Sequence, residues 1–560
     1  MIKYFIIILL SSLSAYTVSD AVGQNGVVVS SKYEASKVGI DILKNGGNAI
    51  DAAVGVAFAL AVTHPSAGNI GGGGFMVIRL ADGTVTTIDF REKAPIFSYK
   101  DMFLDELGNV IPGKSWSSCL AAGVPGTVAG LGYAHEKYGS LKWHELVFPS
   151  FLLAKYGFPL DYFNVSILNS QKYSNYLSND QFSKLYFTKD TPFILNEKFI
   201  QLDLAETLLR IAKYGYKEFY FGKTSKYILN AMNRTGGIIT ANDLANYSPV
   251  ERSPIKFEYN NYKIYSMPPP SSGGITLANI LNQLENINLD SLGYKSADYI
   301  HYFVEAEKRA YADRAKYLGD TDFVDVPIEI LISDSYAFES FSDINSNHSK
   351  DSYSLNEDLF NFSNESEETT HFSVVDKHGN AVSLTYTING WFGNGISVDN
   401  AGFLLNNEMD DFSIKPGYPN AYGLIGNKAN SIEPNKRMLS SMTPTIVEDK
   451  SGQLSMVLGS PGGSTIITTV AQIIVNVVNF DMDIDQAVES KRFHHQWIPP
   501  YIQIEKNSLP NNVIYGLIDK GHQLINRSSI GIGEANCIHI KNGYFFGAAD
   551  SRRGASALGY

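Results

Sequence analysis

The chain has 560 residues, of which 44% are hydrophobic and 18% charged, so it can bury a large core and is not an intrinsically disordered protein. Its 57 acidic and 45 basic residues give a net charge of -12. This balance argues against nucleic acid as a partner, because phosphate binding requires a concentrated basic face, but it leaves room for a small anionic substrate held by one or two local cations.

The N-terminus has the order of a secretory signal peptide. Lys3 precedes an apolar run over residues 4–10, and small residues follow through Ala15 and Ala21. The run is too short to span a membrane, so we expect cleavage between Ala15 and Ala21, with an uncleaved N-terminal anchor as the alternative. Residues 1–21 are therefore predicted to direct a bacterial protein to the periplasm or out of the cell, with no stable membrane span.

The chain that follows alternates predicted helices and strands. Apolar residues at helical spacing predict helices over 31–45 and 48–62. Alternating apolar residues predict strands over 75–80 and 84–90, joined by a turn at 82–83. Two helices followed by two paired strands indicate a layered domain of helices and sheets.

The middle of the chain, residues 141–342, is predicted to be mostly helical and offers few candidate catalytic residues. Within it, residues 296–318 carry apolar and aromatic side chains at helical spacing. Charged residues are interspersed among them, and we expect these to pair along the helix face rather than to build a site. They are Lys308, Arg309, Asp313 and Arg314.

The clearest catalytic chemistry lies in a predicted hairpin over residues 369–393. Two strands with alternating apolar residues flank a turn at 376–380. A polar stretch over 343–368, predicted to be exposed and mobile, precedes them. The hydroxyl-bearing pair Thr369 and Thr370 thus lies where a loose loop becomes a hairpin.

Such a junction suits a protein that cleaves itself. If the bond before Thr369 is broken, this residue gains a free amine with an unperturbed pKa of about 7.7 to 8.0. That amine is a competent base near neutral pH, and it lies on the same residue as the hydroxyl that it would activate. The alternative is that Thr369 and Thr370 are ordinary β-branched strand residues.

Polar candidates follow along the chain. Thr387 and Asn389, predicted on the second strand of the hairpin, lie two apart and therefore face the same side. Glu408 and Asp411 lie three apart and could converge on one cation. The alternative for Glu408 and Asp411 is a turn, which Asn and Asp favour because they hydrogen-bond their own backbone.

Two glycine-rich segments complete the set of candidates. Gly462 and Gly463 precede a long apolar helix predicted over 466–480, where open backbone N–H groups can stabilise the oxyanion of a tetrahedral intermediate. A plain strand-to-helix turn is the alternative. Residues 415–436 are rich in Gly, Pro and Asn, the composition of a functional lid rather than of a packed element.

Neither the cysteines nor the histidines predict a metal site. Cys119 and Cys537 are the only cysteines, and one disulfide between them is possible in an oxidising compartment, although sequence alone cannot pair them. The spacing of His371, His494 and His495 matches no zinc motif, and adjacent histidines on a strand or loop point apart. We therefore assign no metal ligand.

The segment over 369–393, with T-T-H-x-S, G-N-x-V, T-Y-T and N-x-x-F-G, resembles the signature of the gamma-glutamyltransferase (gamma-glutamyltranspeptidase) family. Other segments are similar to the same family, in order, over nearly the whole mature chain. They are GNAIDAAVGVAFALAVTHPSAGNIGGGGF (47–75), DFREKAP (89–95), GVPGT (123–127), PPPSSGG (268–274), KRAYADRAKYLGD (308–320), LLNNEMDDF (404–412), NKRMLSSMTPT (435–445) and GSPGGS (459–464).

The resemblance implies an α+β fold, the four-layer αββα sandwich of N-terminal-nucleophile hydrolases. It implies self-cleavage before Thr369 into a large subunit, 22–368, and a small subunit, 369–560, that remain one structural unit. The choice of Thr369 over Thr370 rests on the family pattern. The implied enzyme cleaves the γ-glutamyl amide of glutathione and related compounds, and passes the group from threonine to water or to amino acids and peptides, without a cofactor.

The resemblance also implies how the charged ends of the substrate are held. Arg91 ends a predicted strand, where an arginine is usually solvated or salt-bridged. In the family this arginine binds the substrate's α-carboxylate, which suits the forked guanidinium, and Ser440 and Ser441 resemble the serine pair that supports it. Glu408 and Asp411 would hold the α-ammonium of the same head group.

The remaining family roles concern the reaction centre. Thr387 would hydrogen-bond the hydroxyl of the nucleophile, and Asn389 would contact the glutamyl end of the substrate. Tyr422, within the segment 415–436, would cover the bound glutamyl group and shield the acyl-enzyme from water.

Two other functions remain open from the sequence. A cephalosporin or glutaryl acylase could use the same scaffold and nucleophile without requiring Arg91 together with Glu408 and Asp411. A non-catalytic secreted binding protein could keep the shape without the chemistry of Thr369.

Overall fold

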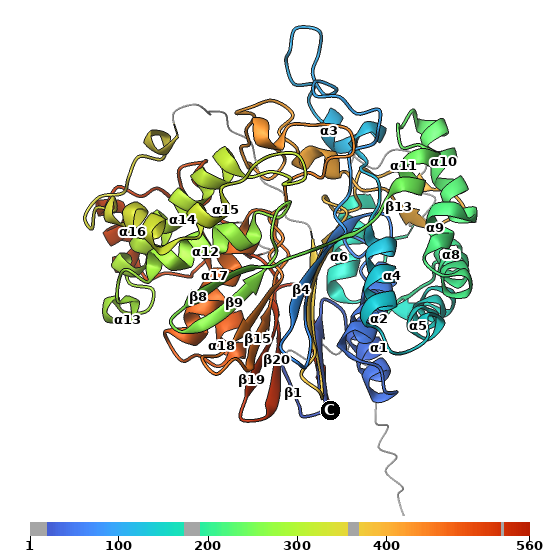
Figure 1. Ribbon diagram of the computed structural model, residues 1–560, viewed down its shortest axis with the longest axis horizontal. Helices are drawn as coiled ribbons and strands as arrows, with labels where there is room; N and C mark the ends of the chain where they lie inside the picture. Colours follow the sequence, from blue (N-terminus) through green and yellow to red (C-terminus); the bar gives the residue numbers. More distant parts are fainter. Residues whose placement is uncertain (1–19, 173–190, 357–368, 528–530) are drawn as a thin grey trace, which may run out of the picture.

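The computed structural model describes residues 20–172, 191–356, 369–527 and 531–560 (Figure 1). In these parts, two seven-stranded antiparallel sheets stack at the centre of the molecule, and helices cover the outer face of each sheet. The predicted four-layer αββα sandwich is therefore confirmed. Most of the predicted signal peptide and residues 357–368 of the predicted polar stretch lie outside the described residues.

The first sheet joins the N-terminal strand to strands from the middle and the end of the chain. Its order is β1 (Asp20–Gly23), β20 (Tyr544–Ala549), β19 (Asn536–Lys541), β15 (Leu454–Leu458), β14 (Thr445–Glu448), β9 (Tyr262–Ser266) and β8 (Ile255–Tyr259). The prediction of a mostly helical middle segment missed β8 and β9, which form one edge of this sheet.

The second sheet holds both hairpins that the sequence predicts. Its order is β21 (Ser556–Gly559), β2 (Gly26–Ser30), β10 (Thr370–Asp376), β11 (Ala381–Thr387), β3 (Gly73–Arg79), β4 (Val85–Asp89) and β7 (Val250–Arg252). Strand β10 pairs with β2 on one side and β11 on the other, so it is held by hydrogen bonds along both edges.

Helices from the first half of the chain pack on the second sheet and lie together on one side in Figure 1. They are α1 (Tyr33–Lys44), α2 (Ala49–Thr63), α4 (Thr127–Tyr138), α5 (Trp143–Tyr156), α6 (Tyr162–Lys172), α8 (Leu202–Tyr214), α9 (Lys217–Phe221), α10 (Lys223–Thr235) and α11 (Ala241–Asn246). Helix α2 begins at a capping box in which Asn48 and Asp51 satisfy each other's backbone N–H groups.

A second group of helices covers the outer face of the first sheet. They are α12 (Gly273–Leu284), α13 (Leu289–Leu292), α14 (Ala297–Tyr317), α15 (Ile328–Leu331), α16 (Asp334–Ser342), α17 (Thr465–Val478), α18 (Ile484–Glu489) and α19 (Asn511–Asp519). Short strands complete the fold: β5 (Phe158–Pro159) with β6 (Lys198–Phe199), β12 (Ser397–Val398) with β13 (Phe403–Leu404), and β16 (Phe493–His494) with β17 (Ile502–Ile504) and β18 (Leu524–Asn526).

Strand β10 shows why the two layers of strands stack. Phe372 and Val374 point to the helices of the first half, as their alternation predicts. Val375 instead belongs to an apolar cluster between the sheets, and the Ser373 hydroxyl donates to the Asn536 carbonyl of the other sheet at 2.8 Å. The hairpin is thus buried on both faces.

Some sequence expectations fail in detail. Strand β11 ends at Thr387, so Asn389 is not a strand residue; it follows the strand with a left-handed φ of 67°. Cys119 and Cys537 are both free thiols in the structure, so the possible disulfide does not form. Among the described residues, no helix combines the length and the apolar character needed to cross a membrane.

Candidate active site

A cavity lies at the end of the β10–β11 hairpin, where segments far apart in the sequence meet. Every site residue predicted from the sequence lines it except Gly462, which is the chain neighbour of Gly463. The lining residues are Arg91, Arg314, Thr369, Thr387, Asn389, Glu408, Asp411, Tyr422, Leu424, Ser440, Ser441, Met442, Gly463 and Ile466.

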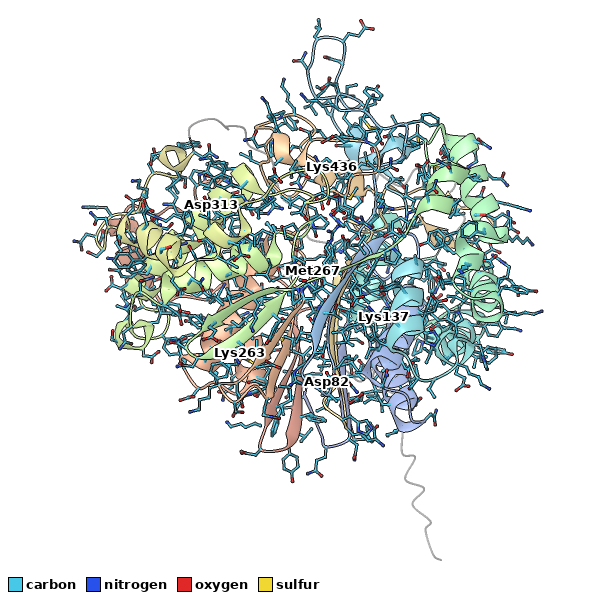
Figure 2. All side chains as sticks on the ribbon, viewed as in Figure 1. Asp82, Lys137, Lys263, Met267, Asp313 and Lys436 are labelled. Atoms are coloured by element: carbon cyan, nitrogen blue, oxygen red, sulfur yellow. The ribbon has the colours of Figure 1, made fainter. Side chains whose placement is uncertain are left out.

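One wall of this cavity is apolar and closely packed. Met442 and Ile466 line it, and they form a buried cluster with Phe75 and Met267. Met267 lies near the centre of the molecule in Figure 2, between the two groups of helices. The wall therefore excludes water on the side of the cavity that faces the protein interior.

Thr369 immediately precedes β10, is 5% exposed and lines the cavity. Its neighbour Thr370 begins the strand, and its hydroxyl lies 2.9 Å from the hydroxyl of Ser31, with which it shares a hydrogen bond. Thr370 is not among the residues that line the cavity. The structure thus distinguishes two threonines that the hairpin pattern alone could not separate.

Thr387 and Asn389 lie next to this junction and are both buried. The Thr387 hydroxyl accepts a hydrogen bond from the backbone N–H of Asn389 at 2.8 Å. The side-chain amide of Asn389 donates to the Asn407 carbonyl at 3.0 Å and accepts from the Tyr422 hydroxyl at 2.5 Å. The turn after β11, rather than a strand, therefore aims Asn389 into the cavity.

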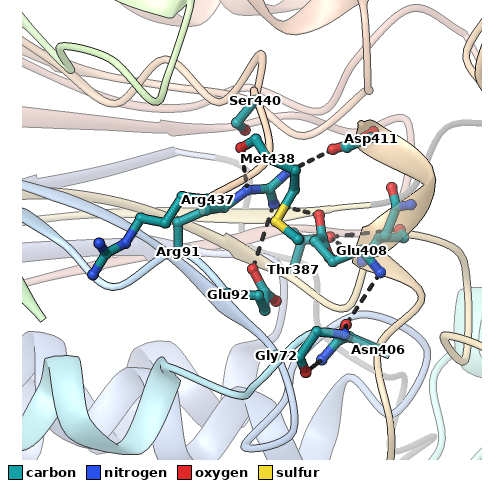
Figure 3. A network of polar contacts seen from close by, with 12 residues as sticks. Gly72, Arg91, Glu92, Thr387, Asn406, Glu408, Asp411, Arg437, Met438 and Ser440 are labelled. Atoms are coloured by element: carbon teal, nitrogen blue, oxygen red, sulfur yellow. Dashed lines mark hydrogen bonds and ion pairs between the residues drawn. The ribbon is translucent and has the colours of Figure 1, made fainter. Parts of the chain in front are cut away.

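Arg91 follows β4 and is fully buried (Figure 3). Its guanidinium forms ion pairs with both Glu408 and Asp411, and its Nε donates to the Met438 carbonyl at 3.3 Å. Although burial alone would lower it, the pKa of Arg91 is raised because Glu408 and Asp411 favour its charged form. The predicted carboxylate-binding arginine thus pairs with the two acids that are predicted to bind the ammonium.

The carboxyl groups around Arg91 are crowded. Burial raises the pKa values of Glu408 and Asp411, and the charge of Arg91 opposes that shift. Glu92 lies 3.6 Å from the Arg91 guanidinium, and burial raises the pKa of its carboxyl to about 7. Burying such a cluster costs free energy, because its charged groups lose their contact with water. Clusters of this kind are common where a site binds a charged ligand.

Ser440 and Ser441 reach the cavity from the segment before β14. The Ser440 hydroxyl accepts from the backbone N–H of Met442 at 3.1 Å, and the Ser441 hydroxyl accepts from Arg314 at 3.1 Å. Arg314 is the lining residue whose position the sequence analysis misjudged: it faces the cavity rather than a partner along its helix. Its neighbour Arg309 does pair along the helix, with Glu305, as expected.

Gly462 and Gly463 form the turn before α17 and have left-handed φ values of 136° and 55°. A Cβ atom on Gly463 would lie 2.5 Å from Cδ1 of Tyr422, so this position requires glycine. Within the described part of the chain, no acceptor is hydrogen-bonded to the backbone N–H of Gly462 or Gly463. Gly463 lines the same cavity as Thr369, and Gly462 is its chain neighbour, so these two N–H groups are the candidate donors of an oxyanion hole.

The segment 415–436 is better packed than its composition predicts. Tyr422 is 4% exposed, and it joins the core of the second group of helices together with Leu424 and Ile425. Gln496 donates to the Tyr422 carbonyl at 3.1 Å. The expectation of an unpacked lid is therefore wrong for 422–425, because the side chains of Tyr422, Leu424 and Ile425 anchor this part of the segment in the core. Tyr422 nevertheless lines the cavity, where its ring lies against Gly463.

The histidines of the sequence analysis occupy hydrogen-bonded positions. His371 bonds Thr385 at 2.8 Å and His494 bonds Thr468 at 2.8 Å. Elsewhere, His301, Glu305 and His522 place ligand atoms within 4.8 Å of one another. There the two imidazoles hydrogen-bond each other and Glu305 pairs with two cations, Lys308 and Arg309, so this cluster has the contacts of a structural network.

With this geometry in place, comparison with known sequences decides the family. The family model described as Gamma-glutamyltranspeptidase matches residues 35–560. The chain belongs to the gamma-glutamyltranspeptidase family. Among curated members, the glutathione hydrolase proenzyme of Escherichia coli is 47% identical over 532 residues, which cover 94% of this chain and 90% of that protein. The glutathione hydrolase proenzyme of Bacillus subtilis is 38% identical, with 96% and 92% of the two chains covered.

Solved structures agree with the family assignment. The gamma-glutamyltranspeptidase of Helicobacter pylori is 44% identical, with a TM-score of 0.55 and coverage of 60% of this chain and 93% of that chain. A cephalosporin acylase from Bacillus halodurans has a TM-score of 0.84 and covers 99% of both chains at 23% identity. The second likeness shows a shared fold between gamma-glutamyltranspeptidases and acylases, and nothing about substrate.

Proposed function

We propose that this protein is a self-processing γ-glutamyltransferase that cleaves the γ-glutamyl amide of glutathione and related compounds. The observation that carries the proposal is that Thr369 shares a cavity with Arg91, Glu408 and Asp411. Arg91 can bind a carboxylate, and the two acids can bind an ammonium, so together they suit both charges of a free amino-acid head group. The names of the curated relatives, glutathione hydrolase proenzymes, support this choice of substrate.

Self-cleavage starts when the Thr369 hydroxyl attacks the carbonyl of the preceding residue. The carbonyl moves from the Thr369 nitrogen to its hydroxyl oxygen, so the peptide bond becomes an ester and the α-amine of Thr369 is freed. Water then hydrolyses the ester, which releases the carboxyl group of residue 368 and regenerates the Thr369 hydroxyl. The products are a large subunit ending at residue 368 and a small subunit of residues 369–560. They stay together because β10 lies between β2 and β11, so the new terminus continues into the middle of a sheet. The H. pylori chain, which aligns with 60% of this one, has the extent expected of a separate large subunit.

In turnover, the α-amine of Thr369 takes the proton of its own hydroxyl, which attacks the γ-carbonyl of the substrate. The N–H groups of Gly462 and Gly463 receive the oxyanion, and Thr387 hydrogen-bonds the hydroxyl of the nucleophile. The leaving amine, cysteinylglycine in the case of glutathione, takes the proton. The acyl group on Thr369 then passes to water, or to the amine of an amino acid or peptide.

Binding of the head group requires the ion pairs around Arg91 to rearrange. The substrate carboxylate takes one arm of Arg91 together with the hydroxyls of Ser440 and Ser441, while Glu408 and Asp411 turn to the substrate ammonium. Because one set of charges replaces another, binding leaves no buried charge unpaired. Asn389 holds the glutamyl end, and the ring of Tyr422 covers it.

Export accompanies this function in the proposal. The signal peptide is removed by a cut between Ala15 and Ala21. The pairing of Asp20 and Ala21 with Ala548 and Gly547 in the first sheet favours a cut before Asp20 within that range. The mature enzyme then acts in the periplasm or outside the cell.

A combined assay tests the proposal. Purified protein is run on a denaturing gel and assayed with a γ-glutamyl anilide and a glutaryl anilide. We expect two chains and faster release from the γ-glutamyl compound. Faster release from the glutaryl compound indicates an acylase, and a single full-length chain without activity indicates a binding protein.

A further inference from the structure

Helix α14 lies within one of the segments that resemble the family, and its charged residues divide into two groups. Lys308 and Arg309 both pair with Glu305 on the same helix at 2.7 Å. Arg314, more than one turn further on, is buried and lines the cavity that contains Thr369. The two groups therefore have different surroundings, and only the first is explained by pairing along the helix.

Arg314 holds the segment that carries the two cavity serines. Its Nε donates to the Ser272 hydroxyl at 2.9 Å, and one terminal nitrogen donates to the Ser441 hydroxyl at 3.1 Å. Ser272 in turn donates to the Ser440 carbonyl twice, from its hydroxyl at 2.7 Å and from its backbone N–H at 2.8 Å. Arg314 is thus one bond from Ser441 and two bonds from Ser440, and it fixes how both serines face the cavity.

The partners of Arg314 are neutral, which is unusual for a buried arginine. Within the described residues it forms no ion pair, whereas Arg91 in the same cavity pairs with three carboxylates. Burial lowers the pKa of Arg314 to about 10, and the charge of Arg91 adds to this shift, although Tyr311 and Asp411 favour the charged form. It therefore remains a cation at neutral pH without a carboxylate partner, a state that normally costs free energy unless an anion is supplied.

The charges of the residues that line the cavity indicate which anion would pair with Arg314. Arg91 and Arg314 balance Glu408 and Asp411, so the lining matches a ligand with one positive and one negative end. Without Arg314, the acids of the lining would outnumber its arginines, which disfavours the binding of a carboxylate. Ser441, the hydroxyl that Arg314 holds, is already proposed to bind the carboxylate end.

We propose that Arg314 is a positioning and specificity-determining residue: it orients the Ser441 hydroxyl and supplies the positive charge that a substrate's α-carboxylate balances. This inference rests on the proposed function, because it deepens the account of the same cavity. The inference also gives a role to two segments that resemble the family, 268–274 and 308–320. No step of the proposed reaction uses a residue of either segment.

Calorimetric binding to the processed protein tests the inference with three small acids. L-Glutamate carries both charges of the head group, glutarate lacks the ammonium, and 4-aminobutyrate lacks the α-carboxylate. In Arg314→Gln we expect affinity for glutamate and glutarate to fall about tenfold to a hundredfold, the range for a lost buried bond to a charged group, while affinity for 4-aminobutyrate does not fall. Arg314→Lys, which keeps the charge but loses the fork, should restore part of the loss.

Kinetics provide a second readout and a matched control. With a γ-glutamyl anilide, Arg314→Gln should raise KM more than it lowers kcat, because the residue acts on ground-state binding of the carboxylate. Arg309→Gln removes an arginine from the same helix, away from the cavity, and should leave both constants unchanged. Comparison of thermal unfolding for the two variants separates a loss of binding from a loss of folding.

The outcomes are distinguishable from failure of the proposed function. An equal loss of affinity for all three acids, or no loss, would overturn the role of Arg314 in carboxylate selection. If the wild-type protein binds glutamate more tightly than Arg314→Gln but hydrolyses no γ-glutamyl anilide, the proposed reaction fails while the inference about the binding site stands.

Discussion

The hydroxyl of Tyr422 donates a 2.5 Å hydrogen bond to the side-chain oxygen of Asn389. This bond joins the segment 415–436 to the turn that follows β11, and the ring of Tyr422 lies against Gly463. The positions of Tyr422 and Asn389 are therefore coupled: if Tyr422 moves, Asn389 loses this bond and keeps the one to the Asn407 carbonyl.

Removing that bond should weaken substrate binding. In Tyr422→Phe the ring is kept and the hydroxyl is lost, so we expect KM for a γ-glutamyl anilide to rise about two- to tenfold, the usual range for one buried hydrogen bond. Tyr418→Phe, a matched change in the same segment, should behave as wild type. An unchanged KM in Tyr422→Phe would show that the bond does not contribute to binding.

Arg91 should matter for both binding and stability. Because Arg91→Ala leaves Glu408 and Asp411 buried without their cation, we expect KM to rise about 30-fold or more and stability to fall by about 3 kcal/mol or more. Arg79→Ala, which breaks the buried pair with Glu448 at 2.7 Å, serves as a control that loses stability but keeps KM. Steady-state kinetics and thermal unfolding measure the two effects, and an unaltered KM in Arg91→Ala would contradict the assigned role.

Glycine at 463 should be required for turnover. The backbone φ of Gly463 is 55°, and a Cβ atom added there would lie 2.5 Å from Tyr422. Gly463→Ala must therefore move either the ring of Tyr422 or the backbone N–H groups proposed as oxyanion donors. We expect kcat to fall about 100-fold, the lower end of the range for loss of an oxyanion donor. Gly452→Ala places a methyl group at a similar φ of 80° but in open space, and should leave kcat unchanged. Equal kcat values for the two variants would argue against an oxyanion hole at Gly463.

The pH dependence of stability should reflect Glu534. Burial raises the pKa of its carboxyl to about 7, against the opposing charges of Arg553 and Lys32. Between the unfolded value of about 4.3 and about 7, the folded protein binds more protons than the unfolded chain, so stability falls as the pH rises through this window. Glu534→Gln cannot lose that proton and should gain about 3 kcal/mol relative to wild type across the window.

Unfolding temperatures measured at several pH values check this expectation. Glu329→Gln, a change at an exposed side chain, provides the control and should follow the wild-type profile. A constant difference between Glu534→Gln and wild type from pH 4.5 to pH 7 would contradict the assignment.

The sequence predicted the strands and helices best where one periodicity dominates. The hairpin around Thr369 alternates apolar residues, and α2 is preceded by a capping residue, so local rules sufficed for both. The four-layer arrangement, in contrast, followed from family resemblance, since strands of the first sheet come from both ends and the middle of the chain. Asn389 was placed on a strand because a spacing of two cannot reveal a left-handed turn.

The site could be predicted as a set of residues but not as a set of contacts. That Arg91 pairs with Glu408 and Asp411 depends on tertiary packing. Arg314 was assigned to helix-face pairing, a rule that holds for Arg309, because the direction of a helical side chain relative to a distant loop is not encoded locally. The sequence feature that could have indicated a functional role for Arg314 was its place in a segment that resembles the family.

Replacement of the proposed nucleophile tests the central claim most directly. Wild-type protein should yield a small chain whose first residue, read by Edman degradation, is Thr369. Thr369→Ala should remain one full-length chain without activity, whereas Thr370→Ala, at the hydroxyl bonded to Ser31, should still be cleaved. Two subunits of normal size in Thr369→Ala, or an active wild-type protein with no break before Thr369, would contradict the account.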